Sequence, residues 1–95
     1  MAQLFIRHKV KDYAKWKAQF DEHGEKRKSA GCKGGRLFRS EKDPNEVMIL
    51  FEWEDLGKAH KFAESDDLRQ RMELAGVVGK PELHFFEEIG KFSVY

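Results

Sequence analysis

The side chains with the most evident chemistry in this 95-residue chain are its four histidines. His8 alternates with Leu4, Ile6 and Val10, so in a strand it would share one face with these three aliphatic residues. A histidine in a cavity can act as a general base or hydrogen-bond a substrate oxygen, because its pKa lies near neutrality. We therefore take His8 as the candidate catalytic base. The alternative is a buried histidine with a purely structural hydrogen bond.

The other three histidines occupy less favourable positions. His23 falls on the aromatic stripe of a predicted helix and is expected to face the same cavity, although it is also close to the exposed end of that helix. His60 is expected at the rim of the pocket, and His84 alternates onto the opposite face of the sheet. No two histidines are spaced i, i+3 or i+4, so the sequence predicts no metal site.

Aromatic residues are the second group that could serve a ligand. Most of them must be core in a domain this small, but two or three lining a cavity would suit a flat aromatic or polyketide-like ligand. The residues predicted to line a ligand pocket are Trp16, Phe20, His23, Trp53, His60, Phe62 and Met72. The sequence contains no nucleophile motif, phosphate loop or paired acid site.

Composition excludes several classes of protein. The chain carries 18 basic and 17 acidic residues, and its longest basic run, Lys26-Arg27-Lys28, is interpreted as the solvated end of a helix, so we expect no nucleic-acid binding. No apolar stretch has the length of a membrane span or a signal peptide, so we expect no membrane association. Cys32 is the only cysteine, which is typical of a reducing compartment and favours a cytoplasmic location.

The elements that must position these residues follow from hydrophobic periodicity. Asp12 and Asp55 are candidate helix N-caps, and Ser65-Asp66-Asp67 predicts a break inside the second helix. Turns are expected at residues 41–46 and at Gly79-Lys80-Pro81. The predicted strands are residues 4–10, 36–40, 47–53 and 82–88, and the predicted helices are residues 13–29 and 56–75.

The order β-α-β-β-α-β predicts an α+β, ferredoxin-like fold: a four-stranded antiparallel sheet with two helices on one face. The segment 47–53 is apolar on both faces, so it should be a central strand with both faces covered. A second copy of the chain is predicted to cover the helix-free face, giving a homodimer. The predicted dimer interface consists of Phe5, Met48, Leu50, His84 and Phe86. Residues 1–95 are expected to form one domain, with the apolar tail 90–95 docking on another surface.

Several segments stand in a characteristic order along the chain: Leu4–Val10, Asp12-Tyr13 with Trp16, Asp43–Val47, Phe51–Asp55, Phe62 with Ser65-Asp66, and Ala75–Val77. This ordered set resembles the dimeric α/β barrel superfamily, and within it the antibiotic biosynthesis monooxygenase-like and small cyclase-like proteins. The resemblance extends over about residues 2–89 and implies a homodimer whose two sheets form a barrel, with a cavity between sheet and helices in each subunit.

The superfamily resemblance also bears on cofactors. Haem-degrading relatives place an asparagine on the first strand, a tryptophan after the third strand and a haem-ligating histidine in the second helix. Here the matching positions hold His8, Phe62 and Met72. Because the asparagine and the ligand histidine are missing, we expect no bound cofactor.

Three functions are compatible with this sequence. The first is a cofactor-independent monooxygenase that acts on a phenolic or hydroquinone-like ligand with His8 as base. The second is a non-redox cyclase or isomerase that uses the same base. The third is a non-catalytic module that binds a small hydrophobic molecule or a protein partner. Product analysis without oxygen separates the first two, and the third predicts that replacing His8 leaves ligand affinity nearly unchanged.

Overall fold

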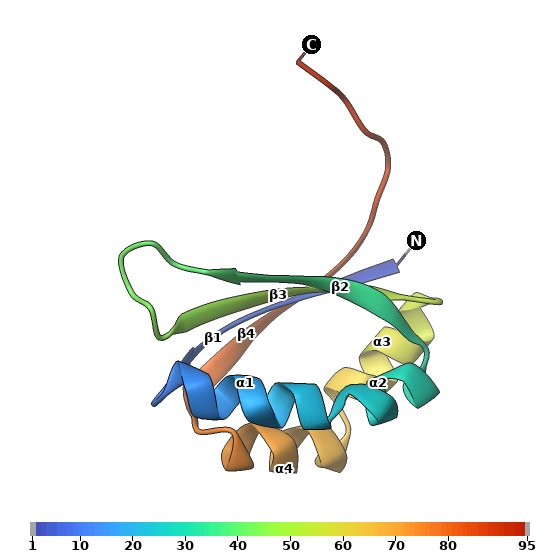
Figure 1. Ribbon diagram of the computed structural model, residues 1–95. Helices are drawn as coiled ribbons and strands as arrows, with labels where there is room; N and C mark the ends of the chain where they lie inside the picture. The colour runs from blue at the N-terminus through green and yellow to red at the C-terminus, as the bar shows by residue number, and fades with distance from the viewer. Residues whose placement is uncertain (1, 95) are drawn as a thin grey trace.

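The computed structural model describes residues 2–94, which form one sheet with all helices on one of its faces (Figure 1). The order of elements confirms the predicted βαββαβ arrangement, with each predicted helix divided into two. The strands are β1 (Ala2–Val10), β2 (Cys32–Arg39), β3 (Glu46–Trp53) and β4 (Val77–Glu87), and the helices are α1 (Tyr13–Glu22), α2 (Gly24–Ala30), α3 (Leu56–Ala63) and α4 (Asp66–Leu74).

The sheet has the strand order β2-β3-β1-β4, and every neighbouring pair is antiparallel. β3 therefore lies in the interior of the sheet beside β1, as its two-sided apolar sequence predicts. In the β1–β3 register His8 lies opposite Val47, and Ile6 lies opposite Ile49. Because side chains alternate along a strand, these four residues point to the same face, which is the face covered by helices.

The helices begin where the sequence predicts. Asp12 accepts hydrogen bonds from the backbone N–H groups of Ala14 and Lys15, and Asp55 accepts one from Lys58. Ser65 Oγ accepts from the N–H of Leu68 at 3.1 Å, which confirms the predicted break in the second helix. The prediction of one continuous first helix was wrong, because the chain leaves regular α geometry between α1 and α2, where Gly24 follows a turn residue.

Two strands are longer than predicted. β2 begins at Cys32 and includes Gly34 and Gly35, directly after Gly31, which ends α2 with φ of 110°. β4 begins at Val77, so the predicted turn at residues 79–81 was wrong. Those residues form an irregularity within β4, where the register to β1 shifts between Arg7 and Lys9.

The core lies between the helix-covered face of the sheet and the helices. The largest fully buried side chains are Leu4, Ile6, Val47 and Trp53, which all come from the two central strands. Burial of one such side chain contributes about 1.5–3 kcal/mol to folding. The helices add Trp16, Phe62 and Leu68 to the same cluster, so the central strands and the helices share a single core.

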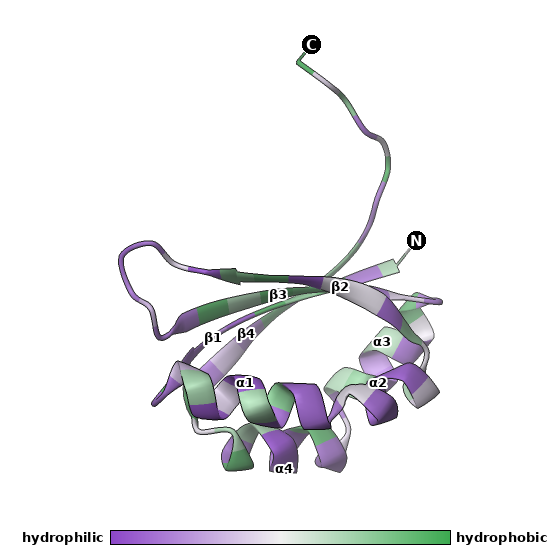
Figure 2. Cartoon of the chain, viewed as in Figure 1, coloured by the Kyte–Doolittle hydropathy of each residue, from purple (hydrophilic) through white to green (hydrophobic). Residues whose placement is uncertain are grey.

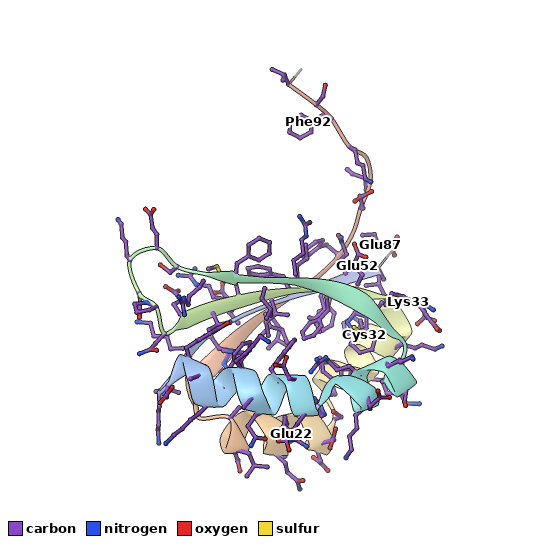
Figure 3. The ribbon with its side chains drawn as sticks, viewed as in Figure 1. Glu22, Cys32, Lys33, Glu52, Glu87 and Phe92 are labelled. Carbon is purple, nitrogen blue, oxygen red and sulfur yellow. The ribbon has the colours of Figure 1, made fainter. Side chains whose placement is uncertain are left out.

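The C-terminal tail leaves the domain on the side of the sheet opposite the helices (Figure 1). It carries the apolar side chains Ile89, Phe92 and Val94, which are at least 84% exposed (Figure 2). Phe92 is far from the sheet and helices in Figure 3. These apolar side chains are thus exposed, and docking of the tail on another surface stays a prediction; Tyr95, part of that predicted segment, lies outside the described residues.

Candidate functional site

A cavity of about 40 Å³ lies between the sheet and the helices, and we call it the central cavity. Strands β1 and β3 form one wall, and helices α1, α2, α3 and α4 form the other. Its lining residues are Ile6, His8, Trp16, Phe20, His23, Arg27, Ile49, Phe51, Phe62, Leu68, Arg71, Met72 and Ala75. The walls are mainly apolar and aromatic, with polar groups supplied by two histidines and two arginines.

His8 is the only side chain from β1 that brings ring nitrogens to this cavity. It is 5% exposed, and neither Nδ1 nor Nε2 makes a hydrogen bond with any group in residues 2–94. Its ring lies edge-on to Trp16, with 5.7 Å between the ring centroids. Burial lowers the pKa of His8 to about 4, because the protonated imidazole would lose its hydration. At neutral pH His8 is therefore uncharged and can accept a proton or a hydrogen bond.

His23 stands on the helical side of the cavity and has a fixed partner. Its Nε2 lies 2.6 Å from Oδ2 of Asp67, and Lys26 donates to the other carboxylate oxygen at 3.0 Å. The hydrogen bonds from His23 and then Lys26 lower the pKa of Asp67 below its usual value. This cluster connects the α1–α2 junction to the first turn of α4, and the carboxylate fixes the orientation of the His23 ring.

Two guanidinium groups complete the polar lining. Arg27 lies over the ring of Phe20, 3.8 Å from its centroid, and donates from Nη1 to the Phe20 carbonyl oxygen at 2.7 Å. Burial lowers the pKa of Arg27, which nevertheless stays charged. Arg71 donates to Oε1 of Gln19 at 2.7 Å and lies 3.7 Å from a carboxylate oxygen of Glu22, at the end of α1 (Figure 3).

The central cavity is lined by His8 and by five of the seven residues predicted for the ligand pocket: Trp16, Phe20, His23, Phe62 and Met72. The structure places the other two elsewhere. Trp53 is completely buried beyond Phe62, with 4.8 Å between ring centroids, because the end of β3 lies deep in the core. His60 is exposed on α3 and stacks on Phe85 at 3.8 Å, because one step along a helix turns a side chain by about 100° away from buried Ala59.

Arg27 and Arg71 also line the central cavity, although neither was predicted from the sequence. The interpretation of the run 26–28 as a solvated helix end was wrong for Arg27, which is half-buried against Phe20. The available signal was spacing, because residues seven apart lie on the same side of a helix and Arg27 follows Phe20 by seven. Arg71 carried no such signal, since its place depends on how α4 packs against α1.

The five residues predicted for a dimer interface share the helix-free face of the sheet. In the register Phe5 lies opposite both Leu50 and His84, and its ring centroid is 6.3 Å from that of His84. Met48 and Phe86 point to the same face by alternation. Phe38 of β2, opposite Met48, adds a further aromatic ring that is 43% exposed. The interface itself stays a prediction.

Other kinds of site find little support in the described part of the chain. No three His, Cys, Asp or Glu side chains within residues 2–94 are grouped so that they could hold a metal ion. Burial raises the pKa of the Cys32 thiol, which opposes a role as a nucleophile at neutral pH. Across residues 2–94 no helix has the length and apolar character needed to cross a membrane.

Proteins of known structure share this fold at low sequence identity. A Bordetella bronchiseptica protein assigned to the antibiotic biosynthesis monooxygenases is 21% identical, with a TM-score of 0.78 over 93% of this chain and 96% of that one. SnoaB from Streptomyces nogalater, described as a cofactor-independent oxygenase, is 14% identical, with a TM-score of 0.77 over 95% and 94%. A conserved protein from Methanosarcina mazei Go1 is 16% identical, with a TM-score of 0.72 over 92% and 91%.

Sequence comparison gives the family directly. No curated protein matches the chain. The family model described as antibiotic biosynthesis monooxygenase matches residues 1–74, which include both central strands and every polar residue of the central cavity. The chain therefore belongs to the antibiotic biosynthesis monooxygenase family, within the dimeric α/β barrel superfamily.

Proposed function

We propose that the central cavity binds a small aromatic or polyketide-like molecule and that the protein oxidises it as a cofactor-independent monooxygenase with His8 as the base. The observation that carries this proposal is His8 itself, an uncharged imidazole with two unpartnered nitrogens inside an aromatic-lined cavity. Leaving a buried polar group without a hydrogen bond costs about 1–3 kcal/mol, and a bound ligand would remove that cost. The description of SnoaB as a cofactor-independent oxygenase supports the same class of reaction.

The reaction balances without a cofactor. The unprotonated nitrogen of His8 removes a proton from an acidic CH₂ group of the ligand, and the resulting carbanion reduces O₂ and forms a C–O bond. The imidazolium returns its proton to the outer oxygen, giving a hydroperoxide. Loss of the second C–H proton then breaks the O–O bond, so that R₂CH₂ + O₂ gives R₂C=O + H₂O. The protein supplies the base, the orientation and a site shielded from water.

Electrostatics favour the anionic stage of this reaction. Arg27 and Arg71 line the cavity on the helical side, whereas no Asp or Glu is among its lining residues. A carbanion or phenolate between these guanidinium groups and a newly protonated His8 would be stabilised by charges of opposite sign. The same anion would raise the pKa of His8 from about 4, which makes proton transfer to this buried imidazole more favourable.

The volume of the cavity favours a second candidate function. About 40 Å³ accommodates a few water molecules and no ring system, so ligand binding requires side chains to move. Phe20 and Met72 are the half-buried, uncharged side chains at its border and would be the first to rearrange. A module that binds a small hydrophobic molecule without transforming it needs only such a pocket. A cyclase or isomerase would use His8 in the same way without consuming oxygen.

Oxygen uptake with a panel of anthrones, whose ring CH₂ group supplies the acidic proton, tests the proposal. For the wild type we expect one O₂ consumed per ligand oxidised, and for His8→Ala a rate at least about 100-fold lower. His84→Ala, on the opposite face of the sheet, is the matched control and should keep the wild-type rate. Product formed without O₂ would identify the cyclase or isomerase instead. Tight binding of a panel member, with no turnover by the wild type, would establish the non-catalytic module.

We also propose that the protein is a homodimer in which the helix-free faces of two sheets pack together. This face presents five apolar side chains that are exposed or only half-buried, and an apolar patch of this kind is typical of an interaction surface: Phe5, Phe38, Met48, Leu50 and Phe86. The tail leaves the domain on the same side, where a second copy would meet it (Figure 1). Sedimentation should give a dimer for the wild type and a monomer for Leu50→Glu. A wild-type monomer at micromolar concentration would refute this arrangement.

A further inference from the structure

Two further hollows lie beside the central cavity, between α2 and β2. The first, which we call the glycine cleft, has a volume of about 300 Å³ and is lined by Phe20, Arg27, Cys32, Gly34, Gly35, Arg36, Leu37, Ile49 and Phe51. The second, the outer mouth, is lined by Gly24, Arg27, Lys28, Cys32, Lys33 and Gly34. Figure 3 shows Cys32 and Lys33 at the beginning of β2, where that strand passes over α2. Arg27 lines all three spaces, so they adjoin one another, and we call the three together the corridor.

Only four side chains separate the central cavity from the glycine cleft, since Phe20, Arg27, Ile49 and Phe51 line both. Ile49 and Phe51 belong to the sheet and are each 4% exposed, so they are fixed by packing. Phe20 and Arg27 come from the helices and are only half-buried. We expect rotation of these two side chains to join the two spaces and so make room for a ligand of three fused rings.

Two of the β2 residues that line the glycine cleft, Gly34 and Gly35, have no side chains, so the strand backbone itself forms part of the cleft wall. A Cβ atom on Gly35 would lie 2.1 Å from the carbonyl oxygen of Leu50, so the backbone of β2 allows only glycine at this position. Gly34 has φ of 128°, a conformation that other residues rarely adopt. The aromatic rings of Phe20 and Phe51, 6.2 Å apart, stand at the inner end of this bare strand and offer flat surfaces to a planar ligand.

All the Asp, Glu, Lys and Arg side chains described along the corridor are basic. Within residues 2–94 no Asp or Glu lines the central cavity, the glycine cleft or the outer mouth, whereas five basic residues do: Arg27, Lys28, Lys33, Arg36 and Arg71. Lys33 is paired with Glu54 at 3.3 Å, and Arg71 lies 3.7 Å from Glu22. Arg27 makes no ion pair with a carboxylate in residues 2–94, and its one hydrogen bond to protein leaves most of its five donors free.

We propose that this corridor admits and recognises a planar aromatic carboxylic acid, whose carboxylate is bound by Arg27 while its rings pass Phe20 toward His8. A guanidinium group can bind a carboxylate through two parallel hydrogen bonds, which adds geometric selectivity to the attraction of charge. The inference rests on the proposed function for the reaction at His8, and it adds the class of ligand and the route by which the ligand arrives.

Binding of 9-anthracenecarboxylate, compared with its uncharged analogue 9-anthracenemethanol, tests the recognition step. Energy transfer from the tryptophans to anthracene reports binding, because Trp16 lines the central cavity and stacks on Phe20 at 5.1 Å. We expect the wild type to bind the acid at least about tenfold more tightly than the alcohol. Arg27→Met should lose this preference, and Arg27→Lys should keep part of it. Arg69→Met, an arginine on the exposed side of α4, should behave as the wild type.

The role of Phe20 at the passage to the central cavity is tested by the rate of ligand association. Phe20→Leu should speed the association of 9-anthracenecarboxylate several-fold in stopped-flow fluorescence, because a smaller side chain obstructs the passage less. Failure of the wild type to bind the acid, equal affinity for acid and alcohol, or full preference retained in Arg27→Met would overturn the proposal. These results are independent of oxygen uptake, so a protein that binds the acid through Arg27 without oxidising any ligand would refute only the monooxygenase reaction.

Discussion

The buried state of His8 makes the stability of this protein depend on pH in a way that one substitution can isolate. In the folded protein the pKa of His8 is about 4, and in the unfolded chain it returns to its ordinary value of 6.5. Between these two values the unfolded chain binds a proton that the folded protein does not bind. The free energy of unfolding must therefore fall as the pH is lowered through 6.5, and this loss stops below about pH 4.

The size of the effect follows from the same two values. A difference of one pH unit corresponds to about 1.4 kcal/mol, so the whole interval from 6.5 to 4 corresponds to about 3 kcal/mol. Over the practical range from pH 7.5 to 5.5 the contribution of His8 is about 1 kcal/mol. His8 is 5% exposed, so little of this is lost to screening by solvent. His8→Leu removes the titrating group and should remove this part of the pH dependence.

Urea unfolding of the wild type and His8→Leu at pH 7.5, 6.5 and 5.5, at one protein concentration, measures the difference. Other titrating groups, including Asp67, are present in both proteins and cancel. Met72→Leu is the matched control, because it changes the lining of the same cavity at nearly constant volume and leaves His8 in place. It should keep the wild-type pH dependence. Parallel curves for the wild type and His8→Leu would refute the buried, uncharged state of His8.

Three further predictions concern the frame around the site. Ser65→Ala removes the cap of α4 and should lower the free energy of unfolding by about 1 kcal/mol in urea titrations; no change would show that the cap is dispensable. Gly35→Ala places a Cβ against the carbonyl oxygen of Leu50 and should lower the melting temperature clearly, whereas Gly90→Ala, with open space around it, should not. Asp67→Asn should destabilise the protein more at pH 7 than at pH 3, because a carboxylate of lowered pKa stabilises above its ordinary pKa and loses this as pH falls; equal losses at both pH values in thermal melts would contradict the pairing with His23.

Sequence patterns were sufficient for the topology because local signals and long-range packing agree. The alternation in β3 requires burial on both faces, and only a central strand provides this in a βαββαβ fold. Capping residues such as Asp55 and Ser65 mark where a helix begins, because their side chains accept a hydrogen bond from a backbone N–H in its first turn. The long first helix and the turn at 79–81 were wrong because glycine is locally ambiguous. Gly24 begins a helix and Gly79 sits inside a strand, and tertiary pairing decides both cases.

The site was less predictable because it is assembled from two strands and four helices. His8 and Trp16 could be placed by periodicity alone, since each lies on a regular element with a clear apolar face. Arg27 and Arg71 depend on the positions of α2 and α4 relative to α1, which no periodicity describes. The error for Trp53 has a similar origin, since alternation gives the face of the sheet but not the distance along β3 to the cavity.

His8 and Trp53 both bury ring nitrogens that have no hydrogen-bond partner in the described chain, but only His8 borders the central cavity. Trp53 Nε1, like both nitrogens of His8, is buried without a hydrogen-bond partner in the described chain. Trp53 lies outside the central cavity, packed between Phe51 and Phe62, so no ligand there can reach its N–H group, and the missing bond is a consequence of core packing.

His8 differs because the central cavity lies beside it. A neutral imidazole offers one donor and one acceptor, which together match a ligand hydroxyl or a water molecule. Trp53→Phe should therefore retain ligand binding and oxygen uptake, whereas His8→Leu should lose oxygen uptake, although each substitution removes buried polar atoms that have no partner. Stability is measured alongside activity in both variants, so that unfolding is not mistaken for loss of the base. Equal activity in the two variants would mean that the unpaired nitrogens of His8 are, like that of Trp53, only a consequence of packing.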